Sequence, residues 1–321
     1  MSKILVTGGA GFIGSNIVEK LLQMEQVSTV RVIDNLSNGF KKNLDEFMEH
    51  PKFEYVWGDI RDYNTCEQAC QGMNLVCHQA ALGSVPRSIN DPVTSNNVNI
   101  TGTLNIFTAA KNTGLNRVVY AASSSTYGDS KTLPKVEENI GNPLSPYAVT
   151  KLVNELYAQV YADLYDINFI GLRYFNVFGP KQDPNGAYAA VIPLFMKAIL
   201  NNTPPTINGD GLQSRDFTYI DNAVQANIKA LFTDNEEALN QVYNVAVGDR
   251  VTLLDLYNNL AKIAQTDLKP NFGPPRPGDV RHSQADISKA KRLLNYDPKI
   301  KVEKGLELAY EWYKDQMANS H

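Results

Sequence analysis

Cysteine and histidine are scarce in this sequence, which contains three cysteines and four histidines among 321 residues. So few cysteines cannot form the dense disulfide framework of a small secreted domain. The histidines are scattered and show no metal-ligand spacing, so we expect no metal site. Cys66, Cys70 and Cys77 are predicted to be reduced thiols that are incidental to the structure, although the first two have the i,i+4 spacing of one helix face.

Long apolar runs and an excess of one charge are also absent. The formal net charge is -4 and the pI is near 5.7, which disfavours a basic surface for nucleic acid or membranes. The apolar run Ile4–Val6 is too short for a signal-peptide core, and no later run could cross a bilayer. We therefore expect a cytoplasmic protein without nucleic-acid or membrane partners, although a locally basic pocket for an anionic ligand stays open.

The first half of the chain alternates short β-branched runs with amphipathic segments. The predicted strands are Ile4–Thr7, Val30–Ile33, Phe53–Val56, Leu75–His78, Arg117–Ala121 and Phe169–Arg173. The predicted helices between them include Ser15–Leu22, Val98–Lys111 and Ala148–Leu164. Strands that alternate with crossover helices predict an α/β fold of the Rossmann type, a doubly wound parallel sheet. Its ligands should bind beyond the carboxyl ends of the strands.

The local composition changes after Phe178-Gly179-Pro180, where proline and glycine become frequent. We predict a first domain over residues 1–178 and a smaller, irregular α/β domain over residues 179–321. A segment near residues 215–246 is a candidate for returning to the first domain. Helices are predicted at Leu253–Ala264 and Val302–Met317, and Thr252 with Asp255 resembles a capping arrangement for the former.

A glycine-rich turn follows the first strand, with glycines at positions 8, 9, 11 and 14. Such a turn lets the backbone approach a pyrophosphate, whose charge then meets a helix N-terminus. Asp34, 20 residues after Gly14, ends the second strand, where an acid binds an adenosine ribose and repels a 2′-phosphate. Asp59-Ile60 ends the third strand and is placed to flank the adenine. Although the glycines could serve only a tight turn, this combination favours NAD.

Tyr147 and Lys151 lie four residues apart in a segment that reads as a helix start, with Ser145 as N-cap and Pro146 at the first helical position. A neighbouring ammonium, together with an oxidised nicotinamide, would favour the tyrosine phenolate and make it a usable base. A Tyr–Lys pair at this spacing is commonly just a surface contact. Here the run Ala122–Gly128 places hydroxyls directly after the fifth strand, at the edge where a substrate should bind.

These motifs together resemble the extended short-chain dehydrogenase/reductase family over essentially the whole chain. The resemblance implies that Tyr147 is the acid/base, that Lys151 binds the nicotinamide ribose and lowers the tyrosine pKa, and that Ser123 orients the sugar 4-hydroxyl or ketone. It implies an asparagine near the cofactor at Asn99. The implied NAD contacts are Gly8, Gly11, Phe12, Ile13, Gly14, Asp34, Asn35, Asn38, Asp59, Ile60, Gln79, Ala80, Ala81, Asn99, Tyr147, Lys151 and Val177.

The residues before Thr126 separate two reactions of this family. Its nucleotide-sugar dehydratases carry Thr-Asp-Glu there, whereas this chain has Ser123-Ser124-Ser125. Without the acid and base that expel water, dehydration is disfavoured. Serine, tyrosine and lysine suffice to oxidise a carbinol and reduce it again, so the resemblance implies a UDP-hexose 4-epimerase that works through a 4-keto intermediate and regenerates NAD.

The second half of the chain resembles the nucleotide-sugar side of these enzymes. Asn176 is implied to hold the diphosphate, and Arg215 resembles the family's diphosphate-binding arginine, whose forked donors suit phosphate oxygens. Arg276 would supply a second such arginine, with Asp279 for a ribose, although a lone surface arginine usually serves solubility. The implied substrate contacts are Ser84, Ser123, Ser124, Ser125, Tyr147, Asn176, Ala190, Val191, Arg215, Asn244, Arg276, Asp279 and Ser283.

The size of residue 283 bears on the sugar. Epimerases restricted to UDP-glucose and UDP-galactose place a tyrosine at the position that matches Ser283, so the resemblance narrows to UDP-N-acetylglucosamine 4-epimerases. The loop around Ser84 resembles that of the same subgroup, and Ser84 would meet the sugar or its N-acetyl group. We therefore predict interconversion of UDP-GlcNAc and UDP-GalNAc, with UDP-glucose and UDP-galactose left open. Ser283 could equally be an incidental small residue.

Two other functions stay open. One is a UDP-glucuronate 4-epimerase or decarboxylase of the same family. The other is a non-catalytic NAD-binding sensor or scaffold, which would not need an activated tyrosine. The resemblance also implies a homodimer formed through helices that include Val98–Lys111 and Ala148–Leu164.

Overall fold

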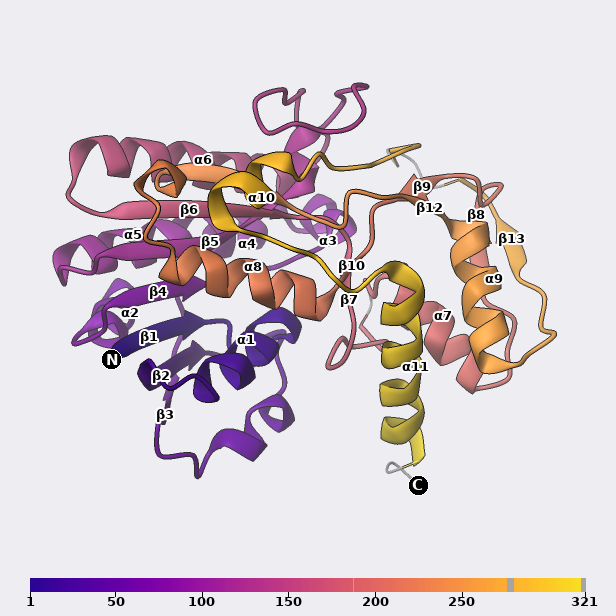
Figure 1. Cartoon of the computed structure of the whole chain (residues 1–321), viewed down its shortest axis with the longest axis horizontal. Coiled ribbons are helices and arrows are strands. Elements are labelled where there is room, and N and C mark those ends of the chain that lie inside the picture. The colour runs from indigo at the N-terminus through magenta and orange to yellow at the C-terminus, as the bar shows by residue number, and fades with distance from the viewer. Residues whose placement is uncertain (187, 276–279, 319–321) are drawn as a thin grey trace.

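The computed structural model describes residues 1–186, 188–275 and 280–318, and a parallel sheet forms its centre (Figure 1). The sheet has seven strands in the order β11-β6-β5-β4-β1-β2-β3. Val6 of β1, for example, faces Val32 of β2 on one side and Cys77 of β4 on the other. The strands are β1 (Ser2–Thr7), β2 (Val27–Asp34), β3 (Phe53–Trp57), β4 (Leu75–His78), β5 (Arg117–Ser123), β6 (Asn168–Tyr174) and β11 (Gln241–Val245).

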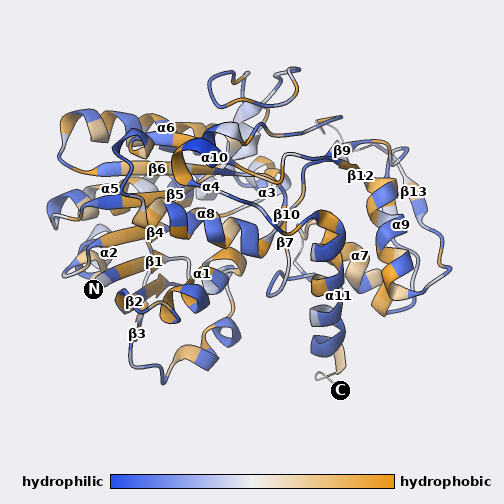
Figure 2. Ribbon diagram, in the orientation of Figure 1, coloured by the Kyte–Doolittle hydropathy of each residue, from blue (hydrophilic) through white to orange (hydrophobic). Residues whose placement is uncertain are grey.

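Helices cover both faces of the sheet, and successive side chains of each strand point alternately to one helical layer and to the other. In β1, Ile4 and Val6 pack into the layer formed with α1 (Phe12–Leu22) and α8 (Ile220–Phe232). Leu5 points to the opposite layer, formed with α2 (Tyr63–Cys70), α5 (Thr103–Asn112) and α6 (Pro146–Leu164). Figure 2 shows the strands as mainly hydrophobic and the helices as two-sided. The predicted doubly wound α/β fold is confirmed.

A second group of elements lies beyond the carboxyl ends of the strands (Figure 1). Its helices are α7 (Val191–Leu200), α9 (Leu253–Ala264) and α11 (Val302–Ala318). Its two-stranded sheets pair β8 (Thr206–Asn208) with β13 (Asn271–Gly273) and β9 (Ser214–Arg215) with β12 (Val251–Thr252). Further elements are α3 (Val85–Asn90) and α4 (Pro92–Asn96) between β4 and α5, the paired strands β7 (Val177–Phe178) and β10 (Thr218–Tyr219), and α10 (Ser288–Leu294), which packs on β11 and α8.

The predicted elements are present, with instructive differences at the edges. The six predicted strands occur with small extensions, whereas β11, which pairs with β6, was not predicted. The expected continuous helix over Val98–Lys111 is divided, because a π-helical turn at Asn97–Gly102 precedes α5. At α9 the Asp255 N–H donates to Thr252 Oγ1 at 3.0 Å, and the Thr252 hydroxyl donates to the Asp255 carboxylate at 2.7 Å. The acid therefore binds the capping hydroxyl, not the backbone as in a full capping box.

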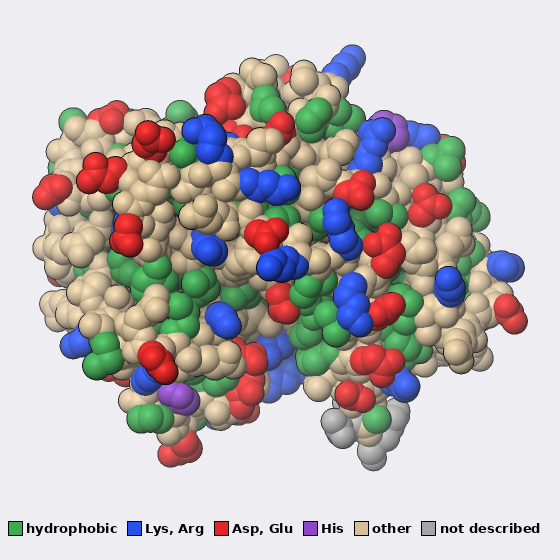
Figure 3. Space-filling view, in the orientation of Figure 1, with side chains coloured by type: hydrophobic (Ala, Val, Ile, Leu, Met, Phe, Trp, Pro, Cys, Tyr) green, Lys and Arg blue, Asp and Glu red, His purple; other side chains and the backbone are tan. Residues whose placement is uncertain are grey.

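No described helix is long and apolar enough to span a bilayer. Within residues 1–186, 188–275 and 280–318 no group of His, Cys, Asp and Glu side chains could hold a metal ion. Acidic and basic side chains are interspersed over the face shown in Figure 3.

Candidate active site

The first pocket lies at the carboxyl ends of β1, β2, β3 and β4. Gly8 takes a φ of 68°, and its carbonyl accepts the Gly11 N–H at 3.1 Å. A Cβ on Gly14 would lie 2.1 Å from the Gly8 carbonyl oxygen, so only glycine permits this turn. Gly11 is the N-cap of α1 and also lines the pocket, which brings the positive end of that helix to it. The turn therefore fits a pyrophosphate.

Asp34 ends β2 at the edge of the same pocket. Its carboxylate oxygens accept the N–H groups of Ala10 at 2.9 Å and Leu36 at 2.8 Å. Each oxygen keeps a further lone pair for a ribose hydroxyl. Burial raises the pKa of Asp34, and the two backbone hydrogen bonds oppose this shift.

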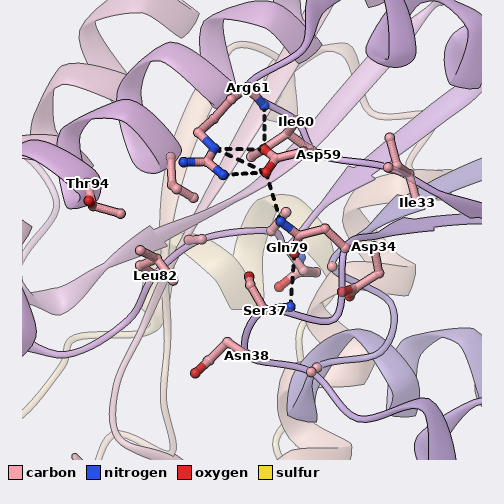
Figure 4. A pocket seen from close by; sticks show the side chains of 18 residues that line it. Ile33, Asp34, Ser37, Asn38, Asp59, Ile60, Arg61, Gln79, Leu82 and Thr94 are labelled. Carbon is pink, nitrogen blue, oxygen red and sulfur yellow. Dashed lines mark hydrogen bonds and ion pairs between the residues drawn. The ribbon is translucent and has the colours of Figure 1, made fainter.

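A charged cluster closes the other end of the pocket (Figure 4). Arg61 pairs with Asp59 at 2.6 Å, and the Asn35 amide donates to the same carboxylate at 2.9 Å. The hydrogen bond from Arg61 is the largest cause that lowers the pKa of Asp59. Figure 4 shows this cluster facing Ser37 and Asn38 across the pocket.

The lining of this pocket can be compared with the predicted NAD contacts. Ten of them line it: Gly8, Gly11, Asp34, Asn35, Asn38, Asp59, Ile60, Gln79, Ala80 and Ala81. Others lie in α1 behind the turn, namely Phe12, Ile13 and Gly14. Lining residues that the sequence reasoning missed include Ser37, Gly39, Arg61, Leu82, Thr94 and Val98. Arg61 could have been found as the neighbour of Asp59-Ile60, whereas Thr94 and Val98 depend on how α4 packs.

Tyr147 and Lys151 lie on one face of α6, whose N-terminus is fixed as predicted: Ser145 Oγ accepts the Ala148 N–H at 3.1 Å. Lys151 Nζ is 5.9 Å from the Tyr147 ring centre and donates to the Ala121 carbonyl at 2.7 Å. Burial lowers the pKa of Lys151 to about 8, which leaves mostly ammonium at neutral pH.

The pKa of Tyr147 differs from the expectation that Lys151 lowers it. Among the protein groups, burial has the largest effect and raises this pKa, while a hydrogen bond with the Ser123 side chain lowers it. Lys151 is not among the causes of this shift; its ammonium donates to the Ala121 carbonyl and lies 5.9 Å from the Tyr147 ring centre.

The serines after β5 form a hydrogen-bonded group with this tyrosine. Ser123 Oγ accepts the Ser125 N–H at 3.1 Å and lies 2.9 Å from Ser125 Oγ. Ser124 is the next residue, at the start of a single 3₁₀ turn, Ser124–Tyr127. Hydroxyls from β5 and from α6 are thus brought together at the carboxyl edge of the sheet.

Asn99 lies in the wall behind the pocket and is completely buried. Its amide oxygen accepts the Leu82 N–H at 2.8 Å. Its amide nitrogen donates to the Leu82 carbonyl at 3.0 Å and to Thr150 Oγ1 at 3.2 Å. Asn99 therefore ties the loop after β4 to the helix that carries Tyr147, and it does not line the pocket.

A second hollow lies beside the two-stranded sheet that β7 and β10 form. It is lined by Asn176, Val177, Phe178, Ala190, Val191, Ile192, Arg215, Phe217 and Leu253. Five of these residues were predicted to bind the substrate or cofactor. Asn176 has a φ of 38°, and its amide donates to the Asp216 carbonyl at 2.9 Å.

Other predicted substrate residues lie elsewhere. Ser84 caps α3 by accepting the Arg87 N–H at 3.3 Å, and the Ser283 N–H donates to the Ser214 carbonyl at 3.0 Å. Asn244 requires a correction, because it is completely buried and its amide oxygen and nitrogen are engaged by Tyr127, Lys135 and Asp286. It lies within the protein interior at the end of β11, so it cannot reach a ligand. Arg276 and Asp279 lie outside the described residues.

A doubly wound sheet with a pyrophosphate turn, an acid after β2 and a Ser–Tyr–Lys group is typical of dinucleotide-dependent enzymes that move hydride at a carbinol carbon. The model of the NAD dependent epimerase/dehydratase family matches residues 4–246. The chain belongs to this family and uses NAD, as predicted.

Relatives resemble the chain along its whole length. A putative UDP-glucose 4-epimerase from Methanocaldococcus jannaschii is 38% identical over 97% of this chain and 98% of its own. The UDP-N-acetylglucosamine 4-epimerase from Methanobrevibacter ruminantium, solved with UDP-N-acetylmuramic acid, is 39% identical with a TM-score of 0.92, covering 98% and 99% of the two chains. The UDP-glucuronic acid 4-epimerase from Bacillus cereus, solved with UDP-glucuronic acid and NAD, is 34% identical with a TM-score of 0.91 and the same coverage. The prediction of an isomerase of the UDP-sugar 4-epimerase type agrees with these relatives, which differ in their sugars.

Proposed function

We propose that the protein is a 4-epimerase that interconverts UDP-GlcNAc and UDP-GalNAc. The observation that carries the proposal is the group of hydroxyls from Ser123, Ser125 and Tyr147 beside the buried ammonium of Lys151. Positions 123–125 hold no carboxyl group that could expel water from a sugar. The group can move one proton on and off a carbinol oxygen, which is the chemistry that 4-epimerisation requires.

Tyr147 is the proposed acid/base. Its phenolic oxygen would take the proton of the sugar 4-hydroxyl. After the 4-keto sugar has turned and hydride has been delivered to the opposite face of C4, Tyr147 would return the proton to the C4 oxygen. Ser123, which shares a hydrogen bond with Tyr147, would hold the oxygen at C4 in line with it. Bound NAD, held by the glycine turn and Asp34, supplies the hydride acceptor and donor, and its oxidised ring supplies positive charge that favours the phenolate.

The substrate's diphosphate would bind at the second hollow, between Asn176 and Arg215. A guanidinium matches phosphate oxygens with two parallel hydrogen bonds. Firm anchoring there would leave the sugar as the only part free to turn between the two hydride transfers. Ser283, whose segment pairs with Ser214 beside Arg215, would leave space for an N-acetyl group.

The N-acetyl preference is supported by the UDP-N-acetylglucosamine 4-epimerase of similar structure and by the small residue at position 283. A second candidate is a UDP-glucuronate 4-epimerase, supported by the similarity to the Bacillus cereus enzyme. A non-catalytic NAD-binding scaffold would have no use for a tyrosine hydrogen-bonded to Ser123 at the sheet edge.

One assay separates these candidates. UDP-GlcNAc, UDP-glucose and UDP-glucuronate are incubated separately with the protein, and the products are resolved by anion-exchange chromatography. The proposal expects UDP-GalNAc to form fastest, and dominant turnover of UDP-glucuronate would contradict the N-acetyl preference. Tyr147→Phe is expected to lower kcat about 10²–10⁴-fold, the usual contribution of an acid/base group, while the Kd for UDP stays within a few-fold of the unaltered protein. Comparable turnover by this variant would exclude Tyr147 as the acid/base.

We also propose a homodimer formed through α6. Large apolar side chains are exposed on this helix at spacings of three, four and seven residues: Val149, Leu156, Tyr157, Val160 and Leu164. A second copy of the same helix would cover this stripe.

The three cysteines are free, which supports a cytoplasmic location. A domain boundary after Phe178, with residues 215–246 returning to the first domain, is supported by the pairing of β11 with β6.

A further inference from the structure

Asp216 is a completely buried carboxylate in the segment between β9 and β10. The buried Glu155 has a bidentate partner in Arg173, at 2.9 and 2.7 Å. Asp216 has no cationic partner within residues 1–186, 188–275 and 280–318. An unpaired buried charge is costly unless hydrogen-bond donors surround it, so its position calls for a physical reason.

The donors around Asp216 come from two distant segments. Oδ1 accepts the Val247 N–H at 3.0 Å, and Oδ2 accepts the Gly248 N–H at 3.1 Å. Both residues follow the end of β11. Oδ2 also accepts the Ala285 N–H at 3.2 Å, from the chain that leads into α10. The Asp216 carboxylate thus links the turn after β11 by hydrogen bonds to the segment around Ala285, which lies nearly forty residues further along the chain.

The segments joined at Asp216 carry the proposed substrate residues. Arg215 directly precedes Asp216 in the chain. The backbone carbonyl of Asp216 accepts a hydrogen bond from the Asn176 amide at 2.9 Å. Ser283 lies two residues before Ala285, and its N–H donates to the Ser214 carbonyl at 3.0 Å. Three residues that the family resemblance assigns to the UDP-sugar, Asn176, Arg215 and Ser283, are therefore held by one buried residue and its neighbours.

The asparagine at this junction is itself held in an uncommon conformation. A φ of 38° lies in the left-handed region, which asparagine tolerates better than most residues but which still needs support from its surroundings. The hydrogen bond from its side chain to the Asp216 carbonyl provides that support. If the Asp216 segment moves, Asn176 and Arg215 move with it.

We propose that Asp216 is a positioning residue for UDP-sugar binding, whose carboxylate holds the Arg215, Asn176 and Ser283 segments in register by accepting three backbone N–H groups. The inference rests on the proposed function for the identity of the ligand. It assigns Asp216 no contact with the substrate and no part in the chemistry. Its loss should weaken UDP binding while NAD, held in the first pocket by the glycine turn and Asp34, stays in place.

Asp216→Asn is the sharpest test because it keeps size and shape. An amide presents one oxygen and one NH₂ group, so at least one of the three N–H groups would face another donor instead of an acceptor. The matched control is Asp62→Asn, which makes the same change at the N-cap of α2, where Asp62 accepts the Asn64 N–H at 3.2 Å. The ligand probe is UDP, measured by isothermal titration calorimetry, with NAD content measured on the same preparations.

Asp216→Asn is expected to raise the Kd for UDP and the KM for UDP-GlcNAc at least tenfold, with kcat within threefold and NAD content unchanged. Asp62→Asn should leave all four quantities near those of the unaltered protein. A UDP Kd within twofold in Asp216→Asn would overturn the inference, as would parallel loss of NAD and UDP, which marks general disruption.

A second variant covers failure of Asp216→Asn to fold. The Gln284 amide donates to the Gly248 carbonyl at 3.1 Å and so braces the same junction from a half-buried position. Gln284→Ala is expected to raise the UDP Kd two- to fivefold, and an unchanged Kd would again overturn the inference. Because UDP binding is measured without turnover, a protein that binds UDP but epimerises no sugar would refute the proposed function and still test Asp216.

Discussion

Replacing Gly8 with alanine is expected to abolish NAD binding, because the new side chain would collide with the backbone of the segment that follows β4. A Cβ at Gly8 would lie 2.7 Å from both the Cα and the N of Ala80, which are backbone atoms and cannot rotate away. The φ of 68° adds the cost of a left-handed conformation, roughly 1–2 kcal/mol for a residue with a Cβ. Forcing extra atoms into a packed site adds about 1–3 kcal/mol. We therefore expect Gly8→Ala to lower the free energy of unfolding by about 2–5 kcal/mol.

The displaced segment after β4 is also part of the cofactor pocket. The Ala80 N–H donates to Thr7 Oγ1 at 3.1 Å, and Ala80 lines the pocket beside Gly8. Relief of the collision must shift either the turn or this wall. Because the pyrophosphate needs backbone N–H groups in place, we expect NAD content to fall at least tenfold.

Gly72→Ala separates the two effects. Gly72 has a φ of 73°, and a Cβ there would meet nothing within 4 Å. This control therefore bears the left-handed cost alone, roughly 1–2 kcal/mol, and should keep its NAD. Urea unfolding gives the stabilities, and chromatography of denatured protein gives the bound NAD. If Gly8→Ala retained as much NAD as Gly72→Ala, the turn would not be the pyrophosphate site.

Three further predictions concern buried groups and assembly. Burial lowers the pKa of His78 to about 3, so the folded state binds fewer protons than the unfolded state below about pH 6.5. The free energy of unfolding should therefore fall by about 1.4 kcal/mol for each pH unit below that value. In urea unfolding at pH 7 and pH 5, His78→Gln should flatten this slope, and an unchanged slope would rule out His78 as its source. Arg173→Met leaves Glu155 buried without a partner and should cost about 3–5 kcal/mol in the same assay, whereas a loss below 1 kcal/mol would contradict the importance of the pair. If the protein forms the proposed homodimer, Val160→Glu should give a monomer in light scattering, while Leu308→Glu on α11 should not, and two dimeric variants would place the interface elsewhere.

Local patterns made most of the sheet and the NAD pocket predictable. The continuous buried run Ile4–Thr7 of β1 and the glycine run after it depend on neighbouring residues, so the sequence alone indicates them. The N-cap of α6 is equally local, because Ser145 and Pro146 act within one helical turn. These short-range signals placed Tyr147 and Lys151 on one helix face.

The remaining features depend on contacts between distant segments. Asn244 reads as an exposed polar residue at a strand end, yet the fold surrounds it with Tyr127 and the carbonyls of Lys135 and Asp286. β11 was missed because its polar residues weaken the strand pattern, and only pairing with β6 defines it. The role of Asp216 is not visible from the sequence at all, since its three donors lie 31, 32 and 69 residues away.

Epimerisation without net redox change is the central claim, and one measurement tests it directly. Purified protein, with no NAD added, is incubated with UDP-GlcNAc labelled with deuterium at C4, and both sugar composition and absorbance at 340 nm are followed. The account predicts UDP-GalNAc that keeps the label at C4, many turnovers per enzyme and no accumulation of reduced cofactor. Failure to form UDP-GalNAc, loss of the label to solvent or a stoichiometric rise in reduced cofactor would contradict it.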